Sequence, residues 1–367
     1  MEALEVKVLE NVFEEKNMIQ RCIQKLIDGA DLSLSEATQV MQEVMAGEVT
    51  NAQTGAFLTA LRIKGESIEE LVAFARVMRS QCRQIKPKVH GKLVDTCGTG
   101  GDRIKTFNVS TVAAFVIAGA CVPVAKHGNR AVTSNSGSAD VLEKLGLNLA
   151  MSPQTVQTTI EKIGIGFMFA PAFHPSMRFA MQSRKELGIR TVFNMLGPLT
   201  NPANATGHLL GVYDAKLVRP LANVLNKLGC ETAMVVHGLN GLDEISTLGK
   251  TCIAYLNRGQ ICDLEVNPEF FGVKQAQEVD LKVSSIDEGT KTIFQILTGK
   301  NLDDLKTEIV LVNSAAGIIV GGKADNFAEA MQIAKESISS GAAYNKLKEL
   351  IDISGGSLQT LEELEAS

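Results

Sequence analysis

A glycine-rich stretch from Gly98 to Asp102 carries the first chemical signal, with three glycines in four residues. It lies between an expected strand over residues 92–97 and an expected helix over 110–120. Glycine lets backbone amides approach an anion closely, because it has no Cβ and tolerates positive φ. The first amides of the following helix lack internal partners and present the positive end of the helix dipole. The stretch matches neither GxGxxG nor GxxxxGK[ST], so it favours phosphate binding in general, and a capped tight turn is the alternative.

Cationic residues follow the next expected strand, over residues 122–126. The stretch from Lys126 to Arg130 holds two cations, an imidazole and an amide. In α/β sheets, ligands gather beyond the carboxyl ends of the strands. Lys126 can serve as a point charge and Arg130 as a planar fork for an anion. A solvated turn is the alternative interpretation.

Two further stretches fit a phosphate and a metal ion. Small polar residues from Ser134 to Asp140 open another expected helix, which suits a phosphate or a plain helix cap. Asp243 and Glu244 follow an expected strand over residues 233–237. Adjacent carboxylates at a strand end suit Mg²⁺, which also binds substrate phosphates, whereas a solvated acidic turn is the alternative. The basic residues after His174, including Arg184, are by default exposed surface arginines.

The elements that position these stretches differ between the two parts of the chain. Residues 1 to about 85 predict successive helices, with Ser33 or Ser35 and Ser67 as helix caps. After Pro87, strands alternate with helices near 155–163, 176–187, 216–228 and 327–339. Further strands are expected at 166–169, 209–213 and 309–312, and a weak strand pattern over 264–290 is not placed. The alternation predicts a mostly parallel sheet covered by helices on both faces.

Composition excludes several classes of protein. The 367 residues carry a formal net charge of −5, and a general nucleic-acid binder would carry a basic excess. Seven widely spaced cysteines without a CxxC pair indicate reduced thiols, and Cys97 lacks neighbours that would activate it. No signal peptide is visible, and the longest apolar run, over 112–124, is too short to span a bilayer. We therefore expect a soluble, cytoplasmic protein that is bound to no membrane.

The ordered set of motifs resembles the anthranilate phosphoribosyltransferase family over essentially the whole chain. The set comprises these stretches: Gly98–Asp102, Asn108–Thr111, Lys126–Arg130, Ser136–Asp140, His174–Pro175, Gly197–Pro202 and Asp243–Glu244. The resemblance implies transfer of the 5-phosphoribosyl group from phosphoribosyl pyrophosphate (PRPP) to the amine of anthranilate, the second step of tryptophan biosynthesis from chorismate. It also implies up to two Mg²⁺ ions and a homodimer formed through the helical domain. No nucleic-acid partner is expected.

The family's fold implies a small all-helical domain and a large α/β domain with a central, mostly parallel sheet. We expect the helical domain over residues 1–86, joined by part of 190–205, and the α/β domain over 87–367.

The resemblance also assigns residues by matching motif. The metal ligands would be Ser110, Asp243 and Glu244. Anthranilate would contact Gly98, His127, Asn129 and Arg184. The residues implied for PRPP are Gly98, Gly101, Asp102, Thr106, Asn108, Val109, Ser110, Thr111, Lys126, His127, Gly128, Asn129, Arg130, Ala131, Val132, Thr133, Ser134 and Ser138.

Two positions depart from the family pattern. Arg103 stands where the family often has glycine, and it would stiffen the loop or add a phosphate contact. Asn135 stands where the family often has lysine, and it would weaken PRPP binding. Two rival functions stay open. The first is a pyrimidine nucleoside phosphorylase of the same fold, although that group tends to have a Lys-x-Ser pattern at the position where this chain has Lys126 and the residues after it. The second is a non-catalytic relative that binds nucleic acid.

Overall fold

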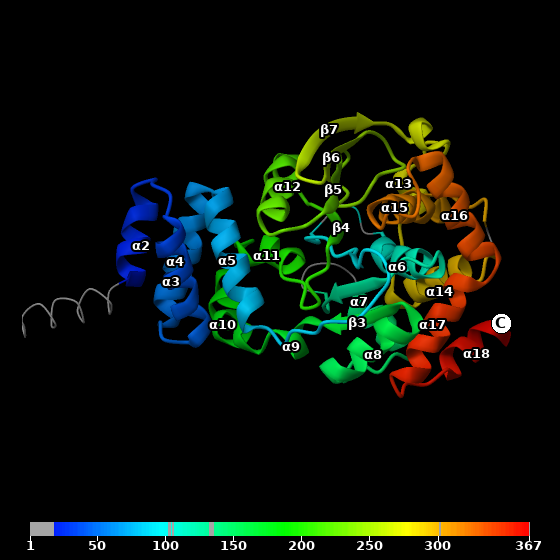
Figure 1. The fold of residues 1–367 in the computed structure, drawn as a ribbon, viewed down its shortest axis with the longest axis horizontal. Helices are drawn as coiled ribbons and strands as arrows, with labels where there is room; N and C mark the ends of the chain where they lie inside the picture. Colours follow the sequence, from blue (N-terminus) through cyan, green and yellow to red (C-terminus); the bar gives the residue numbers. More distant parts are fainter. Residues whose placement is uncertain (1–17, 102–103, 105, 132–135, 301, 367) are drawn as a thin grey trace, which may run out of the picture. The chain divides into compact units, whose positions relative to one another are not determined.

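The chain folds into two compact units, described separately below. A helical unit comprises Met1–Cys82 and His174–Thr200, and a sheet unit comprises Arg83–Phe173 and Asn201–Ser367 (Figure 1). This combination of a helical part with an α/β part confirms the predicted fold class. The computed structural model describes residues 18–101, 104, 106–131, 136–300 and 302–366.

The helical unit has seven helical segments within its described residues. They are α2 (Met18–Ile27), α3 (Leu34–Ala46), α4 (Asn51–Lys64), α5 (Ile68–Gln81), the 3₁₀ turn η1 (Pro175–Met177), α10 (Arg178–Leu187) and α11 (Phe193–Leu199).

Reciprocal caps begin helices α3 and α5. The Ser33 hydroxyl accepts from the Glu36 amide, and the Glu36 carboxylate accepts from the Ser33 amide. Ser67 and Glu70 form the same arrangement. Such boxes satisfy amides that have no partner inside the helix. The prediction that Ser67 caps a helix is confirmed, and Ser33 rather than Ser35 caps the preceding one.

A seven-stranded sheet forms the centre of the other unit, in the order β3-β2-β1-β4-β5-β6-β7. Its first five members in this order pair in parallel, and β6 and β7 pair antiparallel at the β5 edge. The strands are β1 (Val94–Asp95), β2 (Val124–Gly128), β3 (Ile165–Phe169), β4 (Gly207–Gly211), β5 (Thr232–Gly238), β6 (Thr251–Asn257) and β7 (Gln260–Val266).

Helices connect and cover the strands. They are α6 (Val109–Gly119), α7 (Ser138–Lys144), α8 (Pro153–Ile163), α9 (Ala170–Phe173), η2 (Ala215–Leu217), α12 (Val218–Lys227), η3 (Pro268–Phe271), α13 (Glu278–Leu281), α14 (Ile286–Leu297), α15 (Leu305–Val320), α16 (Phe327–Ser339), α17 (Ala342–Ile353) and α18 (Gln359–Ala366).

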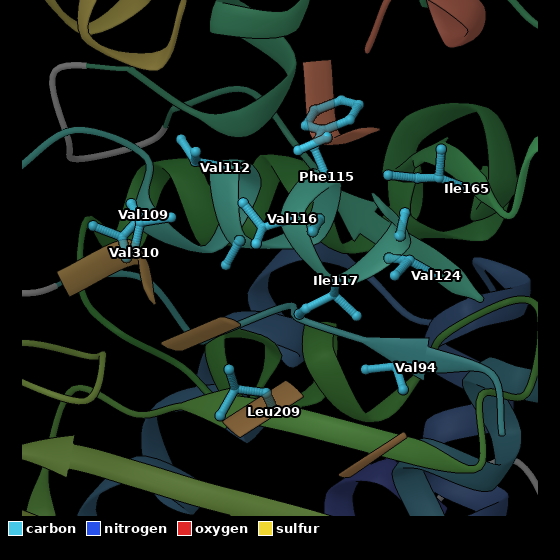
Figure 2. Packing of buried hydrophobic residues seen from close by; sticks show 14 of the residues in the cluster. Val94, Val109, Val112, Phe115, Val116, Ile117, Val124, Ile165, Leu209 and Val310 are labelled. Carbon is cyan, nitrogen blue, oxygen red and sulfur yellow. The ribbon is translucent and has the colours of Figure 1, made fainter. Parts of the chain in front are cut away.

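Helices α6 and α15 form the centre of the core. Helix α6 packs against β2 and β3, α15 packs against β4 and β5, and the two helices pack against each other. Figure 2 shows Val116 and Ile117 of α6 among apolar side chains that include Val124 and Leu209 from the sheet. Burying a side chain of this size contributes about 1.5–3 kcal/mol. The core therefore fixes α6, whose amino end at Val109 follows the glycine-rich stretch by seven residues.

The structure overturns one sequence expectation and describes two regions that sequence patterns did not assign. The predicted strand at 309–312 is wrong, since these residues lie inside α15. That helix is buried on nearly all sides, and a short apolar run does not distinguish a buried helix from a strand. The hairpin of β6 and β7 was not predicted; its turn places Arg258 and Gly259 at φ values of 49° and 83° without the usual Asn-Gly signal. The unplaced region 264–290 is strand only to Val266 and then largely helical or irregular.

Over the described ranges, no helix has both the length and the apolar character needed to cross a membrane.

Candidate active site

Three loops that carry chemical motifs leave one edge of the sheet. Strands β2, β1, β4 and β5 are adjacent and parallel, so their carboxyl ends share that edge. The glycine-rich stretch follows β1, the cationic stretch ends β2 and continues past it, and Asp243 and Glu244 follow β5. The sheet thus gathers motifs that lie far apart in the sequence.

Close backbone packing makes Gly98 and Gly211 necessary as glycines. A Cβ on Gly98 would lie 3.0 Å from the Gly211 oxygen and 3.3 Å from Oδ2 of Asp243. A Cβ on Gly211 would lie 1.5 Å from the Asp243 carbonyl oxygen. The Thr99 amide donates to the Gly211 carbonyl at 2.8 Å. The glycine loop, the end of β4 and the acidic pair are therefore in direct contact.

Lys126 is buried at the end of β2, with 3% of its surface exposed. Its ammonium donates to Oγ1 of Thr96 at 3.1 Å and to the Thr96 carbonyl at 3.3 Å. It also reaches Oγ of Ser110 at 3.5 Å. These contacts place a cation between the end of β1 and the first turn of α6.

A buried carboxylate, Asp95, joins the ends of β1 and β2. It accepts from the amides of Cys97 at 3.1 Å and His127 at 3.2 Å, and from Nδ2 of Asn201 at 2.7 Å. Burial raises the pKa of Asp95 to about 6, although the charge of Lys126 and these hydrogen bonds oppose the rise. The network fixes the backbone from which both motif loops begin.

The amino end of α6 connects three of the motifs. The Ser110 amide donates to Oε1 of Glu244 at 3.1 Å, so the acidic pair meets the positive end of the helix. Asn108 and Ser136 exchange two hydrogen bonds, of 3.1 and 3.0 Å. Thr111 is fully buried, and its hydroxyl has no hydrogen-bond partner among the described residues.

Asp140 organises the loop between β2 and α7. Its carboxylate accepts from the amides of Ala131 at 2.9 Å and Gly137 at 2.8 Å. Burial alone would raise the pKa of Asp140, but these bonds and the Arg130 guanidinium lower it. Arg130 is about half exposed and pairs with Asp140 and Glu143, so in this structure its fork serves carboxylates of the protein itself.

The remaining described residues assigned to PRPP do not all lie in one place. A Cβ on Gly128 would lie 2.2 Å from the Ser138 hydroxyl, which places these two residues together. The carbonyl of Asn129 accepts from Ser138 and from the Ala139 amide. Val109 is buried in the core. Gly101 has a φ of 83°, and Thr106 forms an isolated bridge with Lys282. The following positions lie outside the described residues: Asp102, Arg103, Val132, Thr133, Ser134 and Asn135.

Two residues named from the sequence belong to the helical unit. His174 is buried, which lowers its pKa to about 4 and favours the neutral imidazole. Burial also lowers the pKa of Arg184, whose guanidinium carbon lies 5.3 Å from the centre of the Phe193 ring. An arginine stacked in this way is held in a limited range of orientations.

The oxygen ligands on this side of the site suit a hard cation that is bound partly by the protein and partly by a substrate. Asp243, Glu244 and Ser110 supply carboxylate and hydroxyl oxygens, which Mg²⁺ prefers. Among the described residues, no group of three or more His, Cys, Asp and Glu side chains is placed to hold a metal ion. This agrees with the way Mg²⁺ binds, through one or two carboxylates together with water and phosphate oxygens.

Known proteins share both the sequence and the fold. Residues 90–344 match the model of the glycosyl transferase family a/b domain, and residues 20–82 match its helical bundle domain. The anthranilate phosphoribosyltransferase of Methanocorpusculum labreanum is 49% identical, over 92% of this chain and 99% of that protein. The chain belongs to the anthranilate phosphoribosyltransferase family.

Solved structures of anthranilate phosphoribosyltransferases have the same fold. The enzyme of Thermus thermophilus aligns with a TM-score of 0.85 at 39% identity, covering 91% of this chain and 99% of that one. The enzyme of Saccharomyces cerevisiae, solved in complex with PRPP and Mg, aligns with a TM-score of 0.84 at 28% identity. That alignment covers 92% of this chain and 99% of the yeast chain.

Three residues that support the site were not assigned a role from the sequence. Asn201 and Asp140 lie inside motifs by which the anthranilate phosphoribosyltransferase family was identified, yet only the structure shows their hydrogen bonds. Asn313 lies outside every motif, and its amide group binds the backbone of Ile245, next to the acidic pair. No local sequence signal distinguishes Asn313 from other polar residues in an apolar helix.

The close approach of β4 to the acidic pair predicts the effect of Gly211→Ala. The added methyl would overlap the Asp243 carbonyl, so the backbone must shift, and we expect the free energy of unfolding to fall by about 3 kcal/mol. Gly249→Ala is the matched control, because a Cβ there meets no atom within 4 Å, and it should change stability by less than about 0.5 kcal/mol. Urea denaturation measures both; equal stabilities for the two variants would contradict the packing described.

Proposed function

We propose that this chain transfers the 5-phosphoribosyl group of PRPP to the amine of anthranilate, giving N-(5-phosphoribosyl)anthranilate and pyrophosphate. The observation that carries the proposal is the meeting of the glycine loop, the buried Lys126, the amino end of α6 and the acidic pair at one sheet edge. This arrangement suits a ligand with several phosphates and a divalent cation. The yeast member of the family, solved with PRPP and Mg, supports this choice of ligand.

The diphosphate of PRPP is the group that these residues would hold. Backbone amides of the glycine loop would donate to its oxygens, the positive end of the α6 dipole would face them, and Lys126 would neutralise part of the charge. Mg²⁺ bound by Asp243, Glu244 and Ser110 would withdraw charge from the diphosphate, which makes pyrophosphate a better leaving group. We propose up to two such ions.

The chemistry requires positioning more than acid–base catalysis. The C1–O bond of the ribose breaks with its electron pair leaving on pyrophosphate, and the lone pair of the amine forms the new C1–N bond. An aniline nitrogen is neutral at pH 7, so its lone pair is free, and its proton is lost only as the bond forms. The work of the protein is therefore to align the two substrates and to stabilise the departing charge.

Anthranilate binding is assigned to Gly98, His127, Asn129 and Arg184. Arginine matches a carboxylate with two parallel hydrogen bonds, and burial of Arg184 makes such a pairing favourable. Gly98 carries no side chain, because a Cβ there would meet the Gly211 carbonyl and the Asp243 carboxylate.

We also propose a cytoplasmic homodimer formed through the helical unit. The described residues of that unit expose five large apolar side chains, Ile27, Leu34, Ile63, Met181 and Ile189, at 45% to 82% of their surface. Exposed apolar side chains are candidates for a protein interface. All seven cysteines are free thiols, which suits a reducing compartment.

The decisive assay follows anthranilate fluorescence in purified protein with PRPP and Mg²⁺. We expect fluorescence to fall with time, and to stay constant when EDTA removes the metal. A parallel reaction with a pyrimidine nucleoside and inorganic phosphate tests the nucleoside phosphorylase alternative and should release no base. Phosphorolysis without loss of anthranilate would overturn the proposal.

Arg184→Ala should act mainly on anthranilate. Loss of a charged hydrogen-bonding partner predicts a rise of about ten- to a hundredfold in the anthranilate KM, with a much smaller change in the PRPP KM. Lys185→Ala on the same helix is the matched control, because Lys185 is exposed, and it should leave both constants unchanged. A variant at Arg184 that lost PRPP binding instead would show the assignment to be wrong.

A further inference from the structure

Asn313 is a fully buried amide in the middle of α15, one of the two helices at the centre of the core. Its neighbours along the helix, from Ile309 to Val320, are mostly apolar. A buried amide lowers stability unless its donors and acceptor are paired. An apolar side chain would fill such a position more simply, so the contacts of Asn313 need an explanation.

Those contacts are concentrated on one residue distant in the sequence. Oδ1 of Asn313 accepts from the Ile245 amide at 3.0 Å, and Nδ2 donates to the Ile245 carbonyl at 2.9 Å. The second Nδ2 proton goes to the Ile309 carbonyl, one turn back in α15, at 2.8 Å. Asn313 therefore binds both polar groups of one backbone residue, as a neighbouring strand would.

Ile245 directly follows the acidic pair. This stretch has no regular secondary structure, so its backbone conformation depends on individual contacts. On the amino side, the Leu242 carbonyl accepts from the Gly238 amide at 2.9 Å. On the carboxyl side, the Ser246 amide donates to the Thr251 hydroxyl at 2.9 Å. Asn313 is the connection between this stretch and the core helix that packs under β4 and β5.

The acidic pair has little room to move, because its neighbours pack closely against it. The Asp243 carbonyl lies where a Gly211 Cβ would be, and Oδ2 of Asp243 lies 3.3 Å from where a Gly98 Cβ would be. Glu244 meets the Ser110 amide at 3.1 Å. A small shift of Ile245 would therefore change the distance of Asp243 from the glycine loop and that of Glu244 from the amino end of α6.

We propose that Asn313 is a positioning residue that holds the carboxylates of Asp243 and Glu244 in the arrangement that binds the divalent cation of PRPP. The inference rests on the proposed function, because it concerns the metal ligands of that site. Asn313 acts through the backbone of Ile245 and does not touch the substrate or the metal.

The first variant is Asn313→Leu, which keeps the volume of the side chain and removes all three hydrogen bonds. We expect the Mg²⁺ concentration for half-maximal rate to rise about tenfold or more, which corresponds to the loss of one or two buried hydrogen bonds. The anthranilate KM should change less than about threefold, since the acceptor site is not involved. Asn313→Ser is a second variant, whose short hydroxyl can bond back to its own helix.

Ser314→Ala is the matched control. Ser314 is the next residue of α15 and is equally buried, and its hydroxyl has no hydrogen-bond partner among the described residues. Removing that hydroxyl perturbs the same helix without affecting Ile245. Its Mg²⁺ dependence should stay that of the unaltered protein.

A binding measurement separates this inference from a loss of turnover. Free Mn²⁺ is followed by electron paramagnetic resonance during titration of the protein with PRPP present, without anthranilate. We expect the Mn²⁺ dissociation constant to rise about tenfold in Asn313→Leu and to stay unchanged in Ser314→Ala. If Asn313→Leu does not fold, the same titration of Asn313→Ser decides.

The outcomes distinguish a failure of the proposed function from a failure of the positioning role of Asn313. If the unaltered protein shows no Mg²⁺-dependent consumption of anthranilate, the proposed function fails, and this inference fails with it. If the unaltered protein is active but folded Asn313 variants keep its Mg²⁺ and Mn²⁺ dependence, only the positioning role is overturned. Lower thermal stability with unchanged metal affinity would likewise assign Asn313 to the core alone.

Discussion

The site depends on two opposite charges buried at the ends of adjacent strands, Asp95 on β1 and Lys126 on β2. Neither side chain exposes more than 3% of its surface. Moving such groups out of water is costly unless each finds partners. Asp95 finds them in backbone amides and Asn201, and Lys126 in Thr96 and Ser110. Most of these partners belong to the ends of β1 and β2 and to the amino end of α6, where the phosphate-binding loops begin. The contacts that stabilise the two buried charges therefore also fix the conformation of those loops.

The parallel sheet then makes one surface from distant parts of the chain. Strands β2, β1, β4 and β5 end at the same edge, and each contributes a different component: a cation, a glycine loop, a close backbone approach and an acidic pair. The amino end of α6 adds the positive end of its helix dipole and the hydroxyl of Ser110. Hydrogen bonds and close backbone contacts hold these groups together, which is what transfer by positioning and charge stabilisation requires.

Local sequence patterns predict the motifs of this site and the strands that carry them, but not the residues that hold those motifs in place. Helix caps such as Ser67 and the strands before each motif have local signals, and parallel pairing predicts that the motifs meet. The buried apolar run at 309–312 has no such signal, because strand and buried helix share its composition. Asn201 lies 106 residues from Asp95 and Asn313 lies 68 residues from Ile245. Their roles depend on tertiary contacts that no local pattern contains.

Calorimetric titration of PRPP, with Mg²⁺ present, into the unaltered protein and Lys126→Met measures how far the buried charge at the end of β2 supports PRPP binding. Methionine keeps much of the buried volume and removes the charge. We expect PRPP affinity to fall about ten- to a hundredfold, because a charged hydrogen-bond donor is lost, while the protein stays folded by circular dichroism. Lys92→Met, ahead of β1 at the opposite end of that strand, should bind PRPP normally. Equal PRPP affinity in Lys126→Met and the unaltered protein would contradict the account.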